Sequence, residues 1–311
     1  MKSFGNAVRT APRVRASLAR STRCWNASVA AAQRSGMRCA SSSSSSASSS
    51  PKAEIQKTHL YDLHVARGGK MVPFADYSLP VQYTSASIAD SHHFTRKHAS
   101  LFDVSHMVQH IFQGPQAAAF LERLTPSDWK SQGLMQSKLT TLLWPESGGI
   151  VDDCVITRLG VDVFFAVTNG ACFEKDCRYL DEQMRRYGTD VQWSRQERGA
   201  GLVALQGPRA AEILNEALAE DGGENRVNLD RLYFGSSAFA RLRYSEGGKP
   251  RTTDPVLITR GGYTGEDGFE ISFGAQTPVP GETTALVAES LLEMAGPERL
   301  QLAGLGARDS L

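Results

Sequence analysis

A glycine-rich stretch, residues 261–270 (GGYTGEDGFE), constrains the fold of this 311-residue chain more than any other feature. Gly262, Gly265 and Gly268 recur at every third position, so the backbone can turn tightly and adopt positive φ. Because apolar β-forming residues flank the stretch on both sides, we expect a strand, a tight loop and a second strand. A surface hairpin with solvated acids is the simpler interpretation of the same pattern.

Among the acids of this stretch, only Glu270 continues into the second strand, where its side chain can point inward from a rigid element. A carboxylate accepts two parallel N–H bonds and therefore suits the flat, amide-rich edge of a ligand. The glycine spacing does not indicate a nucleotide cofactor, because no helix follows the loop as a dinucleotide-binding fingerprint requires.

The first 50 residues differ in composition from the rest of the chain. They contain eight basic residues and no acid, and they end in a serine tract. This composition is typical of a mitochondrial or plastid transit peptide, and we expect a disordered leader (1–50) with the mitochondrial matrix as its destination; a plain basic tail is the alternative. The net charge of +1 then leaves −7 for residues 51–311, which disfavours a nucleic-acid partner. No apolar run has the length of about 18 residues that a membrane span needs.

Histidines and cysteines provide the only hints of a metal site. All seven histidines lie between residues 59 and 110, and His106 and His110 are expected to share a strand face. The cysteines outside the leader, Cys154, Cys172 and Cys177, have no metal-binding spacing, and no acid completes a set with the histidines. We therefore predict no bound metal.

Hydrophobic periodicity indicates an α+β fold. We expect helices at residues 58–66, 88–99, 115–124, 171–187, 206–218 and 283–294, and strands at 101–113, 139–144, 150–157, 161–168, 202–205, 238–243 and 255–260. Residues 71–83 contain two prolines and are expected to form an edge strand or loop, and 220–225 a polar loop. Because hairpins mix with β-α-β units, a mixed sheet is favoured over a doubly wound parallel one.

Two adjacent acids, Asp152 and Asp153, lie in the strand expected at 150–157 and therefore point to opposite faces. A carboxylate directed into a core is costly unless it has a partner or a chemical role, so one of the pair is a catalytic candidate. An acid that merely caps the turn explains the pattern equally well. Asn169 follows the next strand and could cap the helix after it or bind a ligand; capping is the simpler interpretation.

Several motifs occur in an order that resembles a known family. They are LYDLH (60–64), GGKMVPFA (68–75), FDVSHM (102–107), GGIVDD (148–153), TN (168–169), EKD (174–176), LQGP (205–208), GYTGEDGFE (262–270), LAGL (302–305) and RDSL (308–311). Together they resemble the glycine cleavage T-proteins (GcvT), a family of folate-binding aminomethyltransferases, over residues 58–311. An iron–sulfur assembly branch of that family is disfavoured, because its cysteine and glutamine are absent from the corresponding positions.

The resemblance implies a GcvT-type fold of two interleaved mixed α/β subdomains. In the family a C-terminal β-barrel follows, and because this chain stops at Leu311 within a motif, we expect residues 51–311 to form a truncated folate-binding domain that lacks the barrel. The implied reaction transfers the methylene carbon of an S-aminomethyldihydrolipoyl carrier protein (H-protein) to tetrahydrofolate, with release of ammonia. A weakly active folate- or carrier-binding remnant is one alternative. The folate module of a dimethylglycine or sarcosine dehydrogenase is another.

The resemblance also implies roles for individual residues. Asp153 corresponds to the catalytic aspartate, which would stabilise the cationic, iminium-like character that develops as the methylene group leaves sulfur or nitrogen. Glu270 would hold the pterin edge, and Arg308 corresponds to an arginine of the folate site. The remaining pocket residues would provide a polar contact, a ring contact and an apolar wall: Asn169, Tyr263 and Met107.

Overall fold

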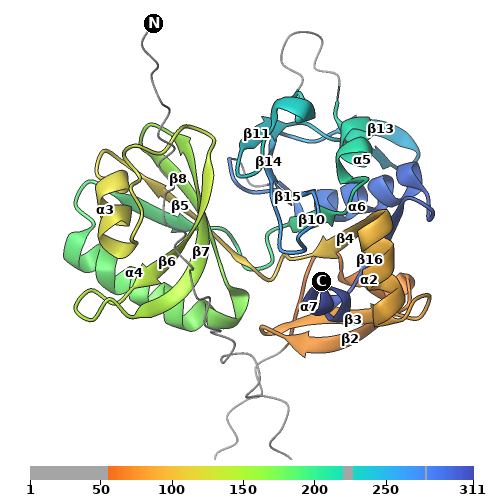
Figure 1. Cartoon of the computed structure of the whole chain (residues 1–311), viewed down its shortest axis with the longest axis horizontal. Helices are drawn as coiled ribbons and strands as arrows, with labels where there is room; N and C mark the ends of the chain where they lie inside the picture. Colours follow the sequence, from red (N-terminus) through yellow and green to blue (C-terminus); the bar gives the residue numbers. More distant parts are fainter. Residues whose placement is uncertain (1–54, 220–226, 277–278) are drawn as a thin grey trace, which may run out of the picture. The chain divides into compact units, whose positions relative to one another are not determined.

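The computed structural model describes residues 55–219, 227–276 and 279–311 (Figure 1). The expected leader and the polar loop at 220–225 lie outside these ranges. The α+β class is confirmed, because antiparallel hairpins dominate two large sheets and helices cover them. In the described part of the chain, no helix is both long and apolar enough to cross a membrane.

A six-stranded sheet forms one half of the structure. Its strands, in spatial order, are β11 (Ser237–Ala240), β14 (Val256–Arg260), β15 (Gly268–Ser272), β10 (Leu202–Gln206), β4 (Ala99–Asp103) and β16 (Leu300–Ala303). All neighbours are antiparallel except β4 and β16. Helices α5 (Ala210–Ala217) and α6 (Gly281–Ala295) pack on one face, where Val203 and Leu205 of β10 enter a large apolar core.

A five-stranded antiparallel sheet forms the other half. Its spatial order is β6 (Ser137–Leu143), β7 (Ile150–Gly160), β8 (Val163–Thr168), β5 (Val108–Gln113) and β9 (Gln192–Arg195). Helices α3 (Ala117–Leu124) and α4 (Phe173–Tyr187) cover one face (Figure 1). Phe164 and Ala166 of β8 point into the core under these helices, as the two-residue period of a strand requires.

The opposite faces of the two sheets share a third apolar cluster, here called the inter-sheet layer. Phe102, Leu202 and Ala204 enter it from the six-stranded sheet, and Phe165 and Val167 enter it from the five-stranded sheet. The alternate residues of the same strands therefore serve two different cores. Residues of β7, β8, β10 and β15 line a common space beside this layer.

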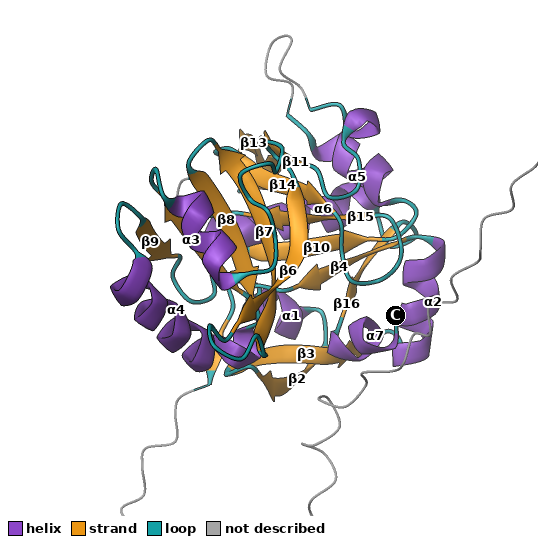
Figure 2. Ribbon diagram, turned by 60° about the vertical axis from the view of Figure 1, so that its left-hand side comes forward, coloured by secondary structure: helices purple, strands orange, loops and turns teal. Residues whose placement is uncertain are grey.

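Smaller elements complete the described chain. A three-stranded sheet contains β1 (Gln56–Lys57), β2 (Gly69–Phe74) and β3 (Tyr77–Tyr83), and β12 (Arg243–Glu246) pairs with β13 (Lys249–Thr252). The remaining helices and 3-10 turns are α1 (Tyr61–Ala66), α2 (Ile88–Lys97), α7 (Leu305–Ser310), η1 (Gly170–Cys172) and η2 (Leu229–Arg231). Helix α7 packs against both α2 and β3 (Figure 2).

A buried polar network joins α1, β3 and β4. The Asp103 carboxylate accepts hydrogen bonds from Thr58 (2.6 Å) and from the His64 ring (3.0 Å), whose other nitrogen lies 2.9 Å from the Tyr83 hydroxyl. Burial alone would raise the pKa of Asp103, but the bonds and charge of His64, with those of Thr58 and Ser105, lower it to about 2. The carboxylate is therefore ionised inside the core.

The expectation of one strand across residues 101–113 was wrong. The segment forms β4 and β5, which belong to different sheets and are separated by a turn. Asp103 closes that turn by accepting a bond from the Ser105 amide (3.0 Å), while Met107 N donates to Val104 O (3.0 Å). Because His106 lies in the turn, it does not share a strand face with His110. The turn was not visible in the sequence, because the apolar alternation continues through it.

The prolines of residues 71–83 are accommodated in a hairpin rather than a loop. Ala75 and Asp76 connect β2 to β3 with φ of 49° and 66°. Pro80 faces the register shift between Lys70 and Met71, where an imino nitrogen costs no ladder hydrogen bond. β3 pairs on both sides, so the edge position expected for this segment holds only for β2.

Candidate functional site

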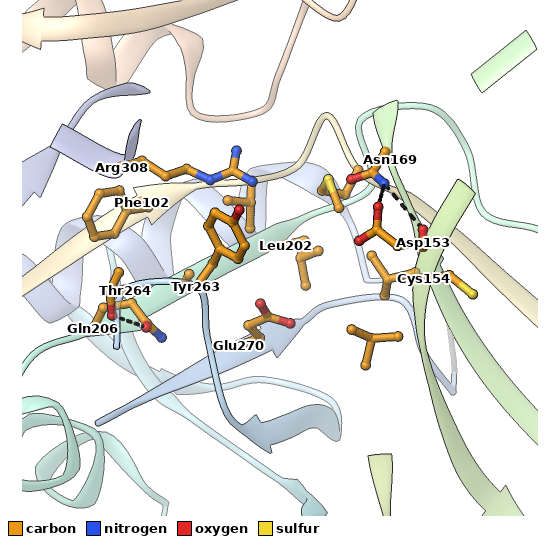
Figure 3. Close-up of a pocket in the computed structure, with 15 residues that line it drawn as sticks. Phe102, Asp153, Cys154, Asn169, Leu202, Gln206, Tyr263, Thr264, Glu270 and Arg308 are labelled. Atoms are coloured by element: carbon orange, nitrogen blue, oxygen red, sulfur yellow. Dashed lines mark hydrogen bonds between the residues drawn. The ribbon is translucent and has the colours of Figure 1, made fainter. Parts of the chain in front are cut away.

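A pocket lies between the two sheets, beside the inter-sheet layer (Figure 3). It contains about 620 Å³ of space, part of it open to solvent. Strands β4, β10 and β15 of one sheet and β7 and β8 of the other contribute its walls, together with the glycine-rich loop and α7. Most of the wall is apolar, and its charged side chains are those of Asp153, Glu270 and Arg308.

All six residues selected from the sequence line this one pocket: Met107, Asp153, Asn169, Tyr263, Glu270 and Arg308. They come from segments spread over 200 positions of the chain, and the structure brings them together. Their roles stay predictions, because shared location does not establish what each side chain binds.

Glu270 enters the pocket from β15, where it is paired with Ala204 on one side and Thr259 on the other. Among the described residues, no hydrogen bond to its side chain is formed. Burial raises the pKa of Glu270, and the positive charge of Arg308 opposes that rise. A carboxylate without a protein donor in a pocket is available to N–H groups of a ligand.

Gln206, the last residue of β10, holds the glycine-rich loop through hydrogen bonds. Its Nε2 donates to the Gly261 carbonyl (2.9 Å), and its Oε1 accepts from the Thr264 hydroxyl (2.8 Å). A Cβ atom at either Gly262 or Gly268 would overlap the Gln206 side chain. The expected strand–loop–strand is thus confirmed as β14, the loop and β15, and the glycines are needed for close approach.

Sequence reasoning missed Gln206 and Thr264 as pocket residues, although both lie in motifs that were noted. The signal in the sequence was the position of Gln206 at the end of a buried strand, where a polar side chain needs a partner. That partner, a loop about 55 positions later in the chain, could not be identified without the sheet pairing. The apolar walls formed by Phe102 and Leu202 were likewise not foreseen.

Asn169 holds Asp153 from the end of β8. Its Nδ2 lies 3.0 Å from Oδ1 of Asp153, 3.2 Å from the backbone carbonyl of Asp153 and 3.2 Å from Oδ2 of Asp152. Asn169 precedes η1, yet its side chain makes no capping hydrogen bond, so the capping interpretation was wrong. The amide instead fixes two neighbouring carboxylates.

Asp152 and Asp153 lie in different surroundings on β7, although the Asn169 amide reaches both carboxylates. Asp153 is exposed at the pocket, whereas Asp152 is half-buried and lies toward α4. There, ligand atoms of Asp152, Cys172 and Asp176 lie within 4.8 Å of one another. That distance alone does not make a metal site, and the expectation that the protein binds no metal stays a prediction.

Arg308 reaches the pocket from α7, with one guanidinium nitrogen 3.4 Å from Nε2 of His106. Burial, followed by the charge of Arg308, lowers the pKa of His106 to about 4. The imidazole is therefore neutral near pH 7 and can accept a bond from Arg308. Tyr263 is 80% exposed at the pocket, where its ring is accessible.

A pocket between a mixed sheet and an antiparallel sheet, with isolated charged groups on mostly apolar walls, has the form of a small-molecule site. Comparison gives the family: the chain matches the GCVT N-terminal domain over residues 60–311 and belongs to that family. The mitochondrial aminomethyltransferase of Saccharomyces cerevisiae is 42% identical over 259 residues, 83% of this chain and 60% of that protein. The mitochondrial aminomethyltransferase of Pisum sativum is 41% identical over 263 residues, 84% of this chain and 58% of that protein.

Solved structures agree with this assignment. The glycine cleavage system aminomethyltransferase T of Bartonella henselae superimposes with a TM-score of 0.66 at 34% identity, covering 83% of this chain and 62% of that one. The expected GcvT-type fold is thereby confirmed. The chain spans about 60% of the length of the curated relatives that it matches.

Proposed function

We propose that this chain acts as an aminomethyltransferase of the glycine cleavage system. The reaction moves the methylene carbon of an S-aminomethyldihydrolipoyl carrier protein to tetrahydrofolate, giving 5,10-methylenetetrahydrofolate and ammonia. Family membership supports the proposal, as do the names of the relatives. The observation that carries it is the pairing of two acids in one pocket: Glu270, which has no hydrogen bond from the described protein, and Asp153, which Asn169 orients.

The chemistry of the pocket supports tetrahydrofolate as the proposed substrate. A pterin presents neighbouring N–H groups along one edge, and the Glu270 carboxylate can accept two of them. Phe102, Leu202 and Met107 offer apolar surface to a flat ring, and Tyr263 offers an aromatic face. Arg308 carries a planar fork of donors suited to a carboxylate, although its partner in a complex is left open.

Asp153 is proposed to act on the reacting carbon. Its carboxylate lies at the pocket and stabilises the positive charge that develops when the methylene group separates from sulfur or nitrogen. It can also orient or accept a proton from a folate nitrogen. Asn169 restrains the carboxylate, so little reorganisation is needed during the reaction. A ligand that fills the pocket would displace water from the apolar walls, which would strengthen the interaction between charges.

The proposed carrier partner is a lipoylated protein whose arm delivers the aminomethyl group to the pocket. The proposed location is the mitochondrial matrix, because residues 1–50 have the composition of a transit peptide and the curated relatives are named mitochondrial. In this proposal residues 51–311 form the folate-binding domain.

Calorimetric titration of the full chain with tetrahydrofolate tests the proposal most directly. We expect binding in the micromolar range that is lost in Glu270→Ala. Glu293→Ala is the matched control, because Glu293 is an exposed acid on α6, and it should bind like wild type. Absence of binding by the folded wild-type chain, or equal binding by Glu270→Ala, would refute the assignment of this pocket to folate.

A further inference from the structure

Asp176 of α4 is a buried acid that the proposed reaction does not use. Its side chain is completely buried, and neither carboxylate oxygen accepts a hydrogen bond from a donor in the described part of the chain. The Asp152 carboxylate of β7 lies beside it, within the 4.8 Å cluster described above. The nearest cation, Lys175 Nζ, is 3.9 Å away and donates instead to the Val151 carbonyl (2.5 Å).

Two carboxylates within 4.8 Å of each other, one of them completely buried, disfavour a second negative charge unless a proton or a cation compensates it. A proton is the better account here. The Asn169 amide already directs a hydrogen atom at Asp152, and the Lys175 ammonium lies 3.9 Å from Asp176, so positive charge adjoins the cluster and disfavours a metal ion. Burial, and next the neighbouring Asp152, raise the pKa of Asp176 to about 8, in agreement with this geometry.

We propose that Asp176 is a positioning residue: it shares a proton with Asp152 and thereby fixes Asn169, which orients the reacting carboxylate. The proton leaves the pair with a single negative charge. Asp152 can then accept from Asn169 Nδ2 on one side and from the shared proton on the other. The same Nδ2 is left aimed at Asp153 Oδ1. The consequence for turnover rests on the proposed function, whereas the shared proton does not.

The other groups that face Asp176 are identified by the physical causes of its pKa shift. Asp152 and Asp153 on β7 raise the pKa of Asp176, and Lys175 on α4 lowers it. Three thiols also lie near Asp176: Cys154, Cys172 and Cys177. Burial raises the pKa of each thiol, so all three stay protonated near neutral pH. Lys175 is thus the single cation in this set, and it does not compensate two anions.

The pH dependence of stability tests the shared proton. The pKa of Asp176 in the folded chain is about 8, well above the unfolded value of about 4, so the folded state holds a proton that the unfolded state releases over this range. Wild-type stability from this group therefore falls as pH rises from about 4 to about 8. Asparagine carries no such proton. We expect the Tm of Asp176→Asn minus that of wild type to grow between these limits and to level off above them.

The matched control is Asp181→Asn, an exposed acid on the same helix, for which the difference in Tm should not change with pH. A constant difference for Asp176→Asn as well would overturn the shared proton. A chelator that lowers the Tm of wild type but not of Asp176→Asn would also overturn it, because a metal ion would then bridge the pair.

The side-chain amide of Asn169 reports positioning directly. Its two N–H signals can be assigned in the full chain by their loss in Asn169→Ala. In wild type we expect the chemical shifts of these signals to change with pH, with the same midpoint as the difference in Tm. In Asp176→Asn we expect no such change. The same pH dependence of these signals in wild type and in Asp176→Asn would refute the connection between Asp176 and Asn169.

Turnover distinguishes a failure of this inference from a failure of the proposed function. If wild type has no aminomethyltransferase activity, the proposed function fails, and the stability and amide titrations still decide the role of Asp176. If wild type is active, Asp176→Asn should retain at least about tenfold more activity than Asp176→Ala, because an amide can still donate to Asp152. Equal loss in both variants would overturn the positioning role.

Discussion

Asp152 and Asp153 are adjacent in the chain but face different surroundings. From the alternation of side chains along a strand, we predicted that the two acids would point to opposite faces. We expected the acid that enters a cavity to have the chemical role. In the structure the more buried acid, Asp152, has Asn169 and Asp176 as protein partners, while Asp153 is exposed at the pocket. Burial depends on α4, a helix whose packing is not visible in the local pattern.

Replacing Asp153 with Asn tests the reacting carboxylate. The change preserves size and leaves Asn169 with a carbonyl acceptor, so we expect the Tm to stay within a few degrees of wild type. Loss of the charge should lower kcat by about 10²–10⁴-fold, the range typical of an electrostatic or acid–base group. Steady-state turnover with a loaded lipoyl carrier measures this. Near-normal kcat in Asp153→Asn would remove that residue from the mechanism.

At the scale of elements, the Asp103 network shows how one acid connects three segments. It joins α1, β3 and β4 through His64, Thr58 and Tyr83, and its position was hidden from sequence reasoning because residues 101–113 alternate without a visible break. Six of the seven helices of the described chain and the β6–β7 hairpin were predictable, since their periodicity is local, whereas α7, which carries Arg308, was not predicted. The assignment of β4 and β5 to different sheets was not, because strand partners are chosen over long distances.

Acid titration should reveal this network. The folded pKa of Asp103 is about 2, below its unfolded value of about 4, so its contribution is present above pH 4 and is lost as pH falls toward 2. We expect Asp103→Asn to lower the free energy of unfolding at pH 7 by about 3 kcal/mol, because a buried carboxylate that accepts hydrogen bonds from Thr58 and the His64 ring loses its charge. The effect should shrink toward pH 2 in thermal melts. Asp62→Asn, an exposed acid on α1, should change little at either pH.

The glycine-rich loop provides a matched pair of substitutions. An added Cβ at Gly262 overlaps the Gln206 side chain, whereas at Gly261 the nearest atom is 3.9 Å away. We expect Gly262→Ala to destabilise the protein by about 1–3 kcal/mol, as overpacking does, and to weaken folate binding. Gly261→Ala should affect both far less. Denaturant unfolding and calorimetry test this, and equal effects of the two changes would contradict the role assigned to Gln206.

At the scale of the whole molecule, the pocket forms only when both sheets are in place. Glu270 comes from one sheet and Asp153 from the other, so a ligand that contacts both should stabilise the two halves together. We expect tetrahydrofolate at 100 times its Kd to add about 2.7 kcal/mol to the free energy of unfolding. Hydrogen exchange should show added protection in β7 and β15 alike. Protection confined to one sheet would mean that the pocket is not bridged.

The inter-sheet layer sets the separation between the two acids. Since Phe102, Leu202 and Val167 are packed between the sheets, their volumes determine how far Glu270 lies from Asp153. The reaction rate and the stability of the fold can then vary independently. Exchanging one aliphatic residue for another in this layer would be tolerated by the fold, but it would misalign Glu270 and Asp153 without changing either residue. The hydrophobic residues between the sheets thus act as a molecular spacer, and drift in their sizes is a route by which such a domain could retain its fold while its catalysis declines.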